Sequence, residues 1–112
     1  MASVSTHVLD TARGRPATGV PVTLLRVSEA GLASPVAAAV TDADGRVGRL
    51  GEPDLPAGTY RLVFDTGAYF AACGQRAFYP EVAVSFAAAE PDGHYHVPLL
   101  LSPFGYTTYR GS

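Results

Sequence analysis

Most of this chain consists of short segments in which apolar and polar residues alternate, separated by glycine or proline. Twelve glycines and nine prolines in 112 residues interrupt the chain too often for long helices. Val20, Val22 and Leu24 occupy every second position and so share one face of an extended strand, a pattern that recurs in later segments. The pattern predicts strands over residues 4–10, 20–27, 36–42, 46–50, 59–65, 81–86, 95–101 and 105–110. Eight short strands predict an all-β fold, a two-sheet sandwich.

One segment has helical spacing. Tyr69, Phe70 and Cys73 recur as on a helix, which predicts a helix over residues 66–74 with Thr66 as N-cap and Gly74 as C-cap. Cys73 is expected there as a small buried apolar residue, since no basic neighbour in the sequence would activate its thiol.

A turn of defined chemistry precedes the fourth predicted strand. In residues 42–45, Asp-Ala-Asp-Gly, glycine tolerates positive φ and the aspartates can hydrogen-bond the turn backbone. The turn places Arg46 at the start of the next strand. From the sequence alone, Arg46 could be a solvated edge arginine, an ion-pair partner of Asp42 or Asp44, or a functional cation.

The strand over residues 95–101 is unusual because both of its faces carry apolar residues. Tyr95, Val97 and Leu99 share one face with Leu101, while the other face carries His96, Pro98 and Leu100. A solvent-facing strand does not normally present proline and leucine. We therefore expect this face to line a cleft or to be covered by another subunit, so that the protein is an oligomer.

Length and charge exclude several classes of protein. The 112 residues suffice for one domain, residues 1–112. The net charge is −2 and all eight basic residues are arginines spread along the chain, which argues against a nucleic-acid groove or a patch for anionic membranes. No apolar stretch approaches the roughly 20 residues of a membrane span, and the N-terminal residues do not resemble a signal peptide. With a single cysteine, a reducing, cytoplasmic location is expected.

The candidate chemistry centres on histidine. His7 and His96 lie in predicted strands and could face one site, although each could equally be an ordinary hydrogen-bonded strand histidine. His94 and His96 have a spacing that zinc could use, but no Asp, Glu or Cys lies near them in sequence to complete a ligand set, and His7 would have to reach them from afar. Nucleophile-elbow and phosphate-loop motifs are absent from the sequence, so any reaction would rely on acid–base chemistry.

Four segments carry a family resemblance: HVLD at 7–10, TDADGR at 41–46, FYPEVAVSF at 78–86 and HYHVPLLLSPFGYTTYRGS at 94–112. Together they resemble the 5-hydroxyisourate hydrolases, the transthyretin-like enzymes of urate catabolism. The terminal Tyr-Arg-Gly-Ser is the most specific part, because the hormone-carrying transthyretins lack it. The resemblance implies an eight-stranded transthyretin-like sandwich with one short helix, assembled as a homotetramer, a dimer of dimers with active sites in a central channel.

The resemblance also implies a site. It places catalytic roles on His7, Arg46, His96 and Ser112, and substrate contacts on His7, Arg46, Tyr109 and Ser112, with His94 outside the set. No metal or organic cofactor is implied. A neutral imidazole could activate water, while an always-charged guanidinium could hold a carbonyl oxygen or an anionic substrate. Either histidine could be the base, and His7 is the favoured one.

Two other functions fit such a sandwich. A transthyretin-like carrier would bind a small planar ligand without chemistry, and would not need His7, Arg46 and His96 together. An adhesive or carbohydrate-binding sandwich would work as a monomer through exposed loops, which the two-sided apolar strand over residues 95–101 argues against.

Overall fold

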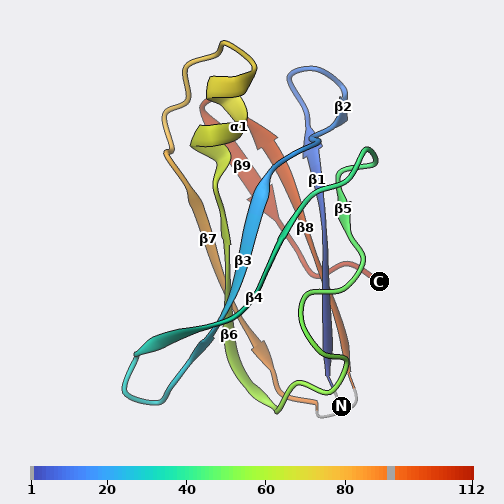
Figure 1. Ribbon diagram of the computed structural model, residues 1–112, viewed down its shortest axis with the longest axis vertical. Coiled ribbons are helices and arrows are strands. Elements are labelled where there is room, and N and C mark those ends of the chain that lie inside the picture. Colours follow the sequence, from blue (N-terminus) through green and yellow to red (C-terminus); the bar gives the residue numbers. More distant parts are fainter. Residues whose placement is uncertain (1, 91–92) are drawn as a thin grey trace.

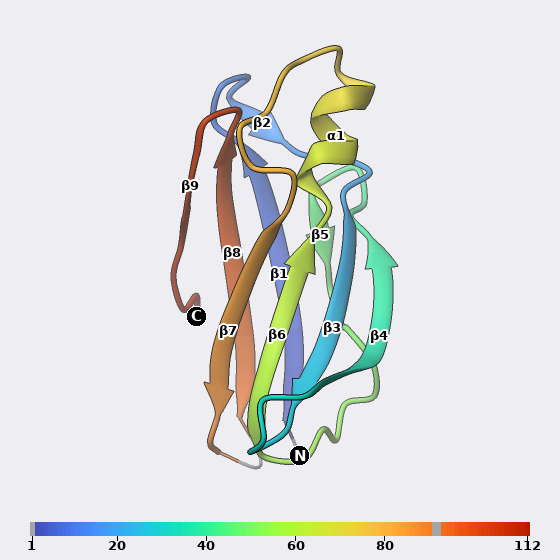
Figure 2. The ribbon, with the colours of Figure 1, turned by 90° about the vertical axis from the view of Figure 1, so that its left-hand side faces the viewer.

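Two β-sheets packed face to face, with one short helix at an end, make up the protein (Figures 1 and 2). The computed structural model describes residues 2–90 and 93–112. Its elements, in chain order, are β1 (Ser3–Asp10), β2 (Arg15–Pro16), β3 (Pro21–Val27), β4 (Ala33–Val40), β5 (Arg46–Val47), β6 (Gly58–Phe64), α1 (Thr66–Ala72), β7 (Val82–Ala88), β8 (His94–Ser102) and β9 (Gly105–Thr108). The predicted all-β sandwich with a single short helix is confirmed.

The two sheets differ in how their strands pair. One has the order β4-β3-β6-β7 and is antiparallel throughout. The other has the order β2-β1-β8-β9, with β5 also pairing with β1. Within it, β1 and β8 run parallel although about 85 residues separate them in sequence. This pairing brings the first and last parts of the chain together at the centre of the second sheet.

The core consists of the alternating residues that the sequence pattern predicts. Val22, Leu24, Leu62 and Phe64 are fully buried in one sheet, and Leu99 faces them from the other. Burying a side chain of this kind contributes roughly 1.5–3 kcal/mol. The inner faces therefore hold the two sheets together, and the outer face of β1 and β8 is left to other roles.

A buried carboxylate fastens the helix to the second sheet. The phenol of Tyr69, in α1, donates a 2.6 Å hydrogen bond to Asp10 at the end of β1, and Asp10 is fully buried. The guanidinium of Arg13 lies 3.8 Å from the same carboxylate. Burial, followed by the contact with Asp10, raises the pKa of Tyr69. The Asp10 of the HVLD segment thus has a structural role.

The structure corrects several predicted details. The N-cap of α1 is Asp65, which accepts from the Ala68 N–H at 3.1 Å, whereas the predicted cap, Thr66, is the first helical residue. Cys73 takes the C-cap position and is only half buried, and Gly74 follows it with φ of 70°. Aspartate caps better than a threonine already inside the first turn, because its carboxylate reaches the free N–H groups.

Strand boundaries also differ in places. A ninth strand, β2, was not predicted, because two residues that include Pro16 carry almost no strand signal. β4 begins at Ala33, within the segment assigned to a loop, and β5 ends at Val47 rather than residue 50. After Val47 the chain becomes irregular, yet the Leu50 N–H still donates to the Val4 carbonyl at 2.9 Å. The remaining predicted strands agree to within two residues at each end.

Two strands at one side of the sandwich have free edges. β7 ends one sheet and β9 ends the other, and Figure 2 shows them close together on the same side of the molecule. In the ranges that the structure describes, no helix has the length and apolar character needed to cross a membrane.

Candidate active site

The outer face of β1, β8 and β5 gathers polar residues that are far apart in the sequence. In the parallel register Ser5 pairs with His96 and His7 pairs with Pro98, while across the antiparallel pair His7 lies opposite Arg46. Paired residues in neighbouring strands point to the same face of a sheet. The strand pairing therefore confirms that His7, Arg46 and His96 lie together, as the alternation in each strand allows.

The C-terminal residues complete this face because the ladder between β8 and β9 is interrupted. It ends at the pair Leu99–Thr108, beside Pro98, and resumes as a single bridge between His96 and Gly111. Proline has no N–H to donate, so Pro98 leaves the ladder with β9 without a donor at this point, while the pairing with β1 on the other side of β8 continues. Beyond the gap the Gly111 N–H donates to the His96 carbonyl at 2.8 Å. In Figure 1 the red terminal segment leaves β9 and turns towards the side of the molecule that carries β5, and Ser112 lines one pocket with Arg46 and Ser5.

Gly111 is required at this point by space. A Cβ there would lie 2.6 Å from Cδ2 of the His96 ring and 3.1 Å from Cγ of Pro98, well inside van der Waals contact. Only glycine lets the backbone lie this close to the imidazole. The close approach carries Ser112 to the site.

These residues enclose a polar pocket of about 240 Å³. It is lined by Ser5, Thr6, Arg46, Val47, Gly48, His94, His96 and Ser112. The volume lies just below the roughly 300–1,000 Å³ of sites for drug-sized ligands, which suits one small heterocyclic molecule. Its lining offers hydroxyls, imidazoles and one guanidinium.

Arg46 is held by the turn that the sequence predicts. The Asp42 carboxylate accepts from the N–H groups of Asp44 and Arg46, both at 2.9 Å. Gly45 has φ of 75°, and a Cβ there would collide with the Val8 carbonyl oxygen. The side chain is exposed, and no carboxylate in residues 2–90 or 93–112 forms an ion pair with it. The ion-pair interpretation of Arg46 is therefore wrong, and its charge is available to a ligand.

His7 is oriented by the same turn. Its Nε2 lies 2.9 Å from the Asp44 carbonyl oxygen, which can only accept, so Nε2 carries a proton. In the neutral ring the lone pair is then on Nδ1. His7 does not line the pocket itself but stands next to it, through its pairing with Arg46 and with Pro98.

His96 is oriented by a serine. Its Nδ1 lies 2.7 Å from Ser5 Oγ, which leaves Nε2 as the ring nitrogen available to a ligand. The imidazole is half buried. Burial lowers the pKa of His96 most, and the nearby basic side chains of Arg46, His7 and His94 lower it further. The ring is thus neutral at pH 7 and can accept a proton.

Ser112 lines the pocket with Arg46 and His96, but Tyr109 does not. Tyr109 is exposed and borders a second, mainly apolar cavity of about 150 Å³ between β7 and β9. In the same segment the Arg110 guanidinium lies 4.8 Å from the centroid of the Tyr95 ring. The terminal tetrapeptide is therefore divided: its first half packs at the sandwich edge and its second half reaches the pocket.

Five of the residues that line the pocket were not predicted as site residues from the sequence: Ser5, Thr6, Val47, Gly48 and His94. His94, set aside as lying outside the site, lines the pocket, and Ser5 contacts both His94 and His96. The available signal was the alternation of Ser3, Ser5 and His7 on one face of β1. Among residues 2–90 and 93–112 no three side chains of histidine, cysteine, aspartate or glutamate are grouped to hold a metal ion.

Comparison with known proteins identifies the family of the chain. The profile of the HIUase/Transthyretin family matches residues 4–111, which is nearly the whole chain. The chain belongs to this family. Within it, "5-hydroxyisourate hydrolase 2" of Rhizobium meliloti is 49% identical, the match covering 97% of this chain and 95% of that protein.

Solved structures of the HIUase/Transthyretin family have the same fold. The 5-hydroxyisourate hydrolase of Klebsiella pneumoniae superposes with a TM-score of 0.86 at 40% identity, over 98% of this chain and 99% of that one. Sea bream transthyretin, solved with thyroxine, gives 0.88 at 38% identity over 96% and 93%. Because hydrolase and transthyretin superpose equally well, the fold alone does not separate the two activities.

Proposed function

We propose that this protein hydrolyses 5-hydroxyisourate to 2-oxo-4-hydroxy-4-carboxy-5-ureidoimidazoline, a step in the breakdown of urate. The observation that carries the proposal is one small polar pocket in which the exposed guanidinium of Arg46 and the neutral imidazole of His96 lie together, with His7 beside them. Hydrolysis of a cyclic amide needs an activated water, a stabilised oxyanion and a proton for the leaving nitrogen. The pocket has a group for each task.

The roles follow from the free ring nitrogens. A water molecule adds to C6 of the substrate and the N1–C6 bond breaks, with one proton leaving the water and one reaching N1. A neutral imidazole, at Nδ1 of His7 or Nε2 of His96, accepts the first proton and the other histidine can donate the second. Arg46 holds the developing negative charge. Ser112 is assigned to hydrogen-bond the substrate.

Tyr109 keeps its proposed substrate contact only if another subunit completes the site. Its ring lies at the edge of the sandwich, on the cavity between β7 and β9, where a neighbouring copy would also lie. The homotetramer, as a dimer of dimers, is therefore part of the proposal. Two free strand edges on one side of the molecule support it, because such edges pair readily with a second chain.

A carrier of a small planar ligand is the alternative function. Sea bream transthyretin, whose structure contains thyroxine, has the same fold. Binding alone would not require two imidazoles side by side at one pocket together with an exposed arginine. The terminal Tyr-Arg-Gly-Ser, part of which lines the pocket, also favours the hydrolase.

The decisive experiment follows 5-hydroxyisourate, generated by urate oxidase, by its absorbance. We expect faster decay with this protein present. His96→Asn and Arg46→Gln should each lower the rate at least ~10²-fold, as is typical when an acid–base or oxyanion group is lost.

Arg61→Gln is the matched control, because Arg61 lies in the other sheet and contacts Ser85. Its rate should equal that of the wild type. If wild-type protein does not accelerate the decay but binds the compound, the carrier function is favoured and the hydrolase is wrong.

A further inference from the structure

Three side chains outside the assigned catalytic set, those of Ser3, His94 and Ser5, form a continuous line of hydrogen bonds that ends at His96. His94 Nδ1 lies 2.6 Å from Ser3 Oγ, and His94 Nε2 lies 3.0 Å from Ser5 Oγ. Ser5 Oγ also lies 2.7 Å from Nδ1 of His96. The parallel register of β1 and β8 produces this line, since Ser3 pairs with His94 and Ser5 with His96.

The line can be hydrogen-bonded in two ways. Each serine hydroxyl has one proton, so Ser5 donates to one imidazole and accepts from the other. If Ser5 donates to His96, the proton of that ring is on Nε2. If Ser5 donates to His94, the proton of His96 is on Nδ1 and Nε2 has the lone pair needed by a base. The direction of the Ser5 hydroxyl therefore decides whether His96 can act on the pocket.

We propose that Ser5 and His94 form a proton relay for His96, with Ser5 as a positioning residue that sets the imidazole tautomer and His94 as the group that delivers the proton to solvent. This inference rests on the hydrolase function proposed above. His94 is then part of the machinery of the site.

The proton balance of the relay is simple. Nε2 of His96 takes a proton from the attacking water, and the ring becomes an imidazolium. Its Nδ1–H bond then breaks as that proton passes to Ser5 Oγ, while the Ser5 O–H bond breaks as its proton passes to Nε2 of His94. The result is a neutral His96 with its proton on Nε2, a serine that now donates to His96, and a protonated His94, which loses its Nδ1 proton to water. When Nε2 of His96 later gives its proton to the leaving nitrogen or to water, the line runs in reverse: Ser5 donates its proton to Nδ1 of His96, Nε2 of His94 donates to Ser5, and Nδ1 of His94 takes a proton from water, which restores the starting arrangement.

The environment favours this direction. In the part of the chain that the structure describes, the groups whose charges act on His96 are Arg46 from β5, His7 from β1 and His94 from β8, all basic. Together with burial they lower the pKa of His96, so a positive charge there is unfavourable. His94 is exposed to solvent, where water stabilises the charge. Transfer of the proton to His94 removes the unfavourable positive charge from the half-buried His96 ring.

Two variants interrupt the relay at different points. Ser5→Ala removes the central hydroxyl, and His94→Gln keeps a hydrogen-bonding side chain that cannot take up a proton. Each should lower kcat about tenfold or more, with KM nearly unchanged, which is less than the ~10²- to 10⁴-fold expected from removing an acid–base group itself. Ser5→Thr, which restores the hydroxyl, should recover part of the rate, and added imidazole should do so for His94→Gln.

Ser85→Ala is the control, because Ser85 is a hydrogen-bonded strand serine in the other sheet. It should turn over like wild type. If Ser5→Ala folds poorly, the His94→Gln variant still tests the relay, because His94 is exposed and its replacement does not disturb the core. Wild-type kcat in His94→Gln, or a loss that imidazole does not restore, would overturn the proposal.

Nitrogen NMR of the imidazole rings tests the relay without substrate, and so separates its failure from failure of the hydrolase function. Ser5→Ala should change the tautomer of His96, and His94→Gln should shift the titration of His96. Unchanged His96 signals in both variants would overturn the relay even in an active hydrolase.

Discussion

At the residue scale, two histidines with different partners divide the chemistry of the pocket. The Nε2–H group of His7 donates a hydrogen bond to a backbone carbonyl. His96 instead contacts a serine hydroxyl, which can either donate to the ring or accept from it. A carbonyl can only accept, so the tautomer of neutral His7 is fixed, and that of His96 can change. His96 is therefore better suited to cycle protons during turnover, even though the sequence alone favours His7 as the base.

The pH dependence of catalysis follows from the environment of His96. Burial and the surrounding positive charges lower the pKa of this ring below its usual value of about 6.5. The neutral base persists at pH 7, and kcat/KM should fall on acidification with a midpoint below about 6.5. Initial rates across the titration range of histidine measure this directly. A rate unchanged from about pH 8 to 5 would mean that no histidine is the base.

The lowered pKa of His96 also makes the stability of the folded chain depend on pH. Between the lowered pKa in the folded chain and the ordinary value in the unfolded chain, the unfolded state binds more protons. The free energy of unfolding should therefore decrease as the pH falls through that window. Thermal unfolding of wild type and His96→Asn, compared at neutral and mildly acidic pH, isolates this contribution because the other histidines are common to both.

Strand alternation indicates from the sequence that His7 and His96 could face one site, and the structure brings both together with Arg46, which only the family resemblance had added. Alternation could not show that β1 and β8 are parallel neighbours, since no local pattern encodes the pairing of segments so far apart. Ser5 was missed for this reason: a serine on a strand is unremarkable until the imidazole beside it is known. The correct placement of Ser112 came from the family resemblance.

At the element scale, the C-terminal segment behaves as part of the site rather than as a frayed end. Gly111 is bonded to His96, and Arg110 lies over the Tyr95 ring. Chain ends normally tolerate deletion. Here the segment covers His96 on one side, so its loss exposes the imidazole and removes Ser112.

Deleting residues 109–112 should therefore greatly reduce hydrolysis while the thermal transition and the assembly persist. Ser112→Ala should show a smaller loss. Gly111→Ala should also reduce activity, because its Cβ would displace the His96 ring. Activity of the truncated protein equal to that of the full chain would restrict the site to His7, Arg46 and His96.

Helix α1 contributes no residue to the lining of the pocket, so changes in it should affect stability and not catalysis. Asp65 caps α1 through the Ala68 N–H, and replacing such a cap by alanine costs about 1 kcal/mol. Asp65→Ala should lower the free energy of unfolding by about that amount in denaturant titrations, with kcat unchanged. Thr66→Val, at the position that the sequence wrongly indicates as the cap, should leave the capping bond intact. Equal decreases in the free energy of unfolding in both variants would contradict the assignment of Asp65 as the N-cap.

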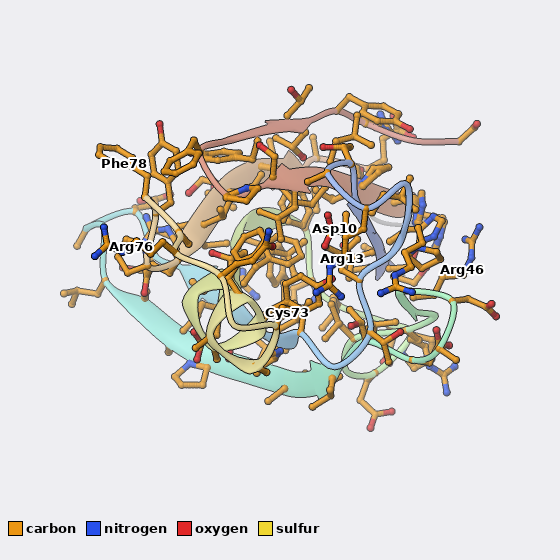
Figure 3. All side chains as sticks on the ribbon, turned by 90° about the horizontal axis from the view of Figure 1, so that it is seen from above. Asp10, Arg13, Arg46, Cys73, Arg76 and Phe78 are labelled. Atoms are coloured by element: carbon orange, nitrogen blue, oxygen red, sulfur yellow. The ribbon has the colours of Figure 1, made fainter. Side chains whose placement is uncertain are left out.

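At the scale of the whole molecule, the pocket and an exposed aromatic patch lie on different sides. The aromatic patch consists of Phe78, Tyr79, Phe104 and Tyr106, and edge-to-face contacts link Phe78 to Tyr79 and Tyr79 to Tyr106. Figure 3, which looks along the sandwich, shows Phe78 on the side opposite Arg46. Such patches on soluble proteins mark interfaces. The aromatic patch lies beside the free edge of β9, whose residues include Tyr106.

The last prediction concerns the oligomer that this side of the molecule supports. Light scattering should give about four times the 11.6 kDa of one chain, because β7 and β9 offer free edges and the aromatic patch offers apolar area. Phe104→Glu should weaken the assembly, since a carboxylate would be buried against apolar surface. Leu32→Glu is the matched control: both residues are 72% exposed, but Leu32 lies between β3 and β4. If wild-type protein at nanomolar concentration is a monomer with full activity, then one chain suffices, the site does not need Tyr109 from a neighbour, and the shared-channel assembly is wrong.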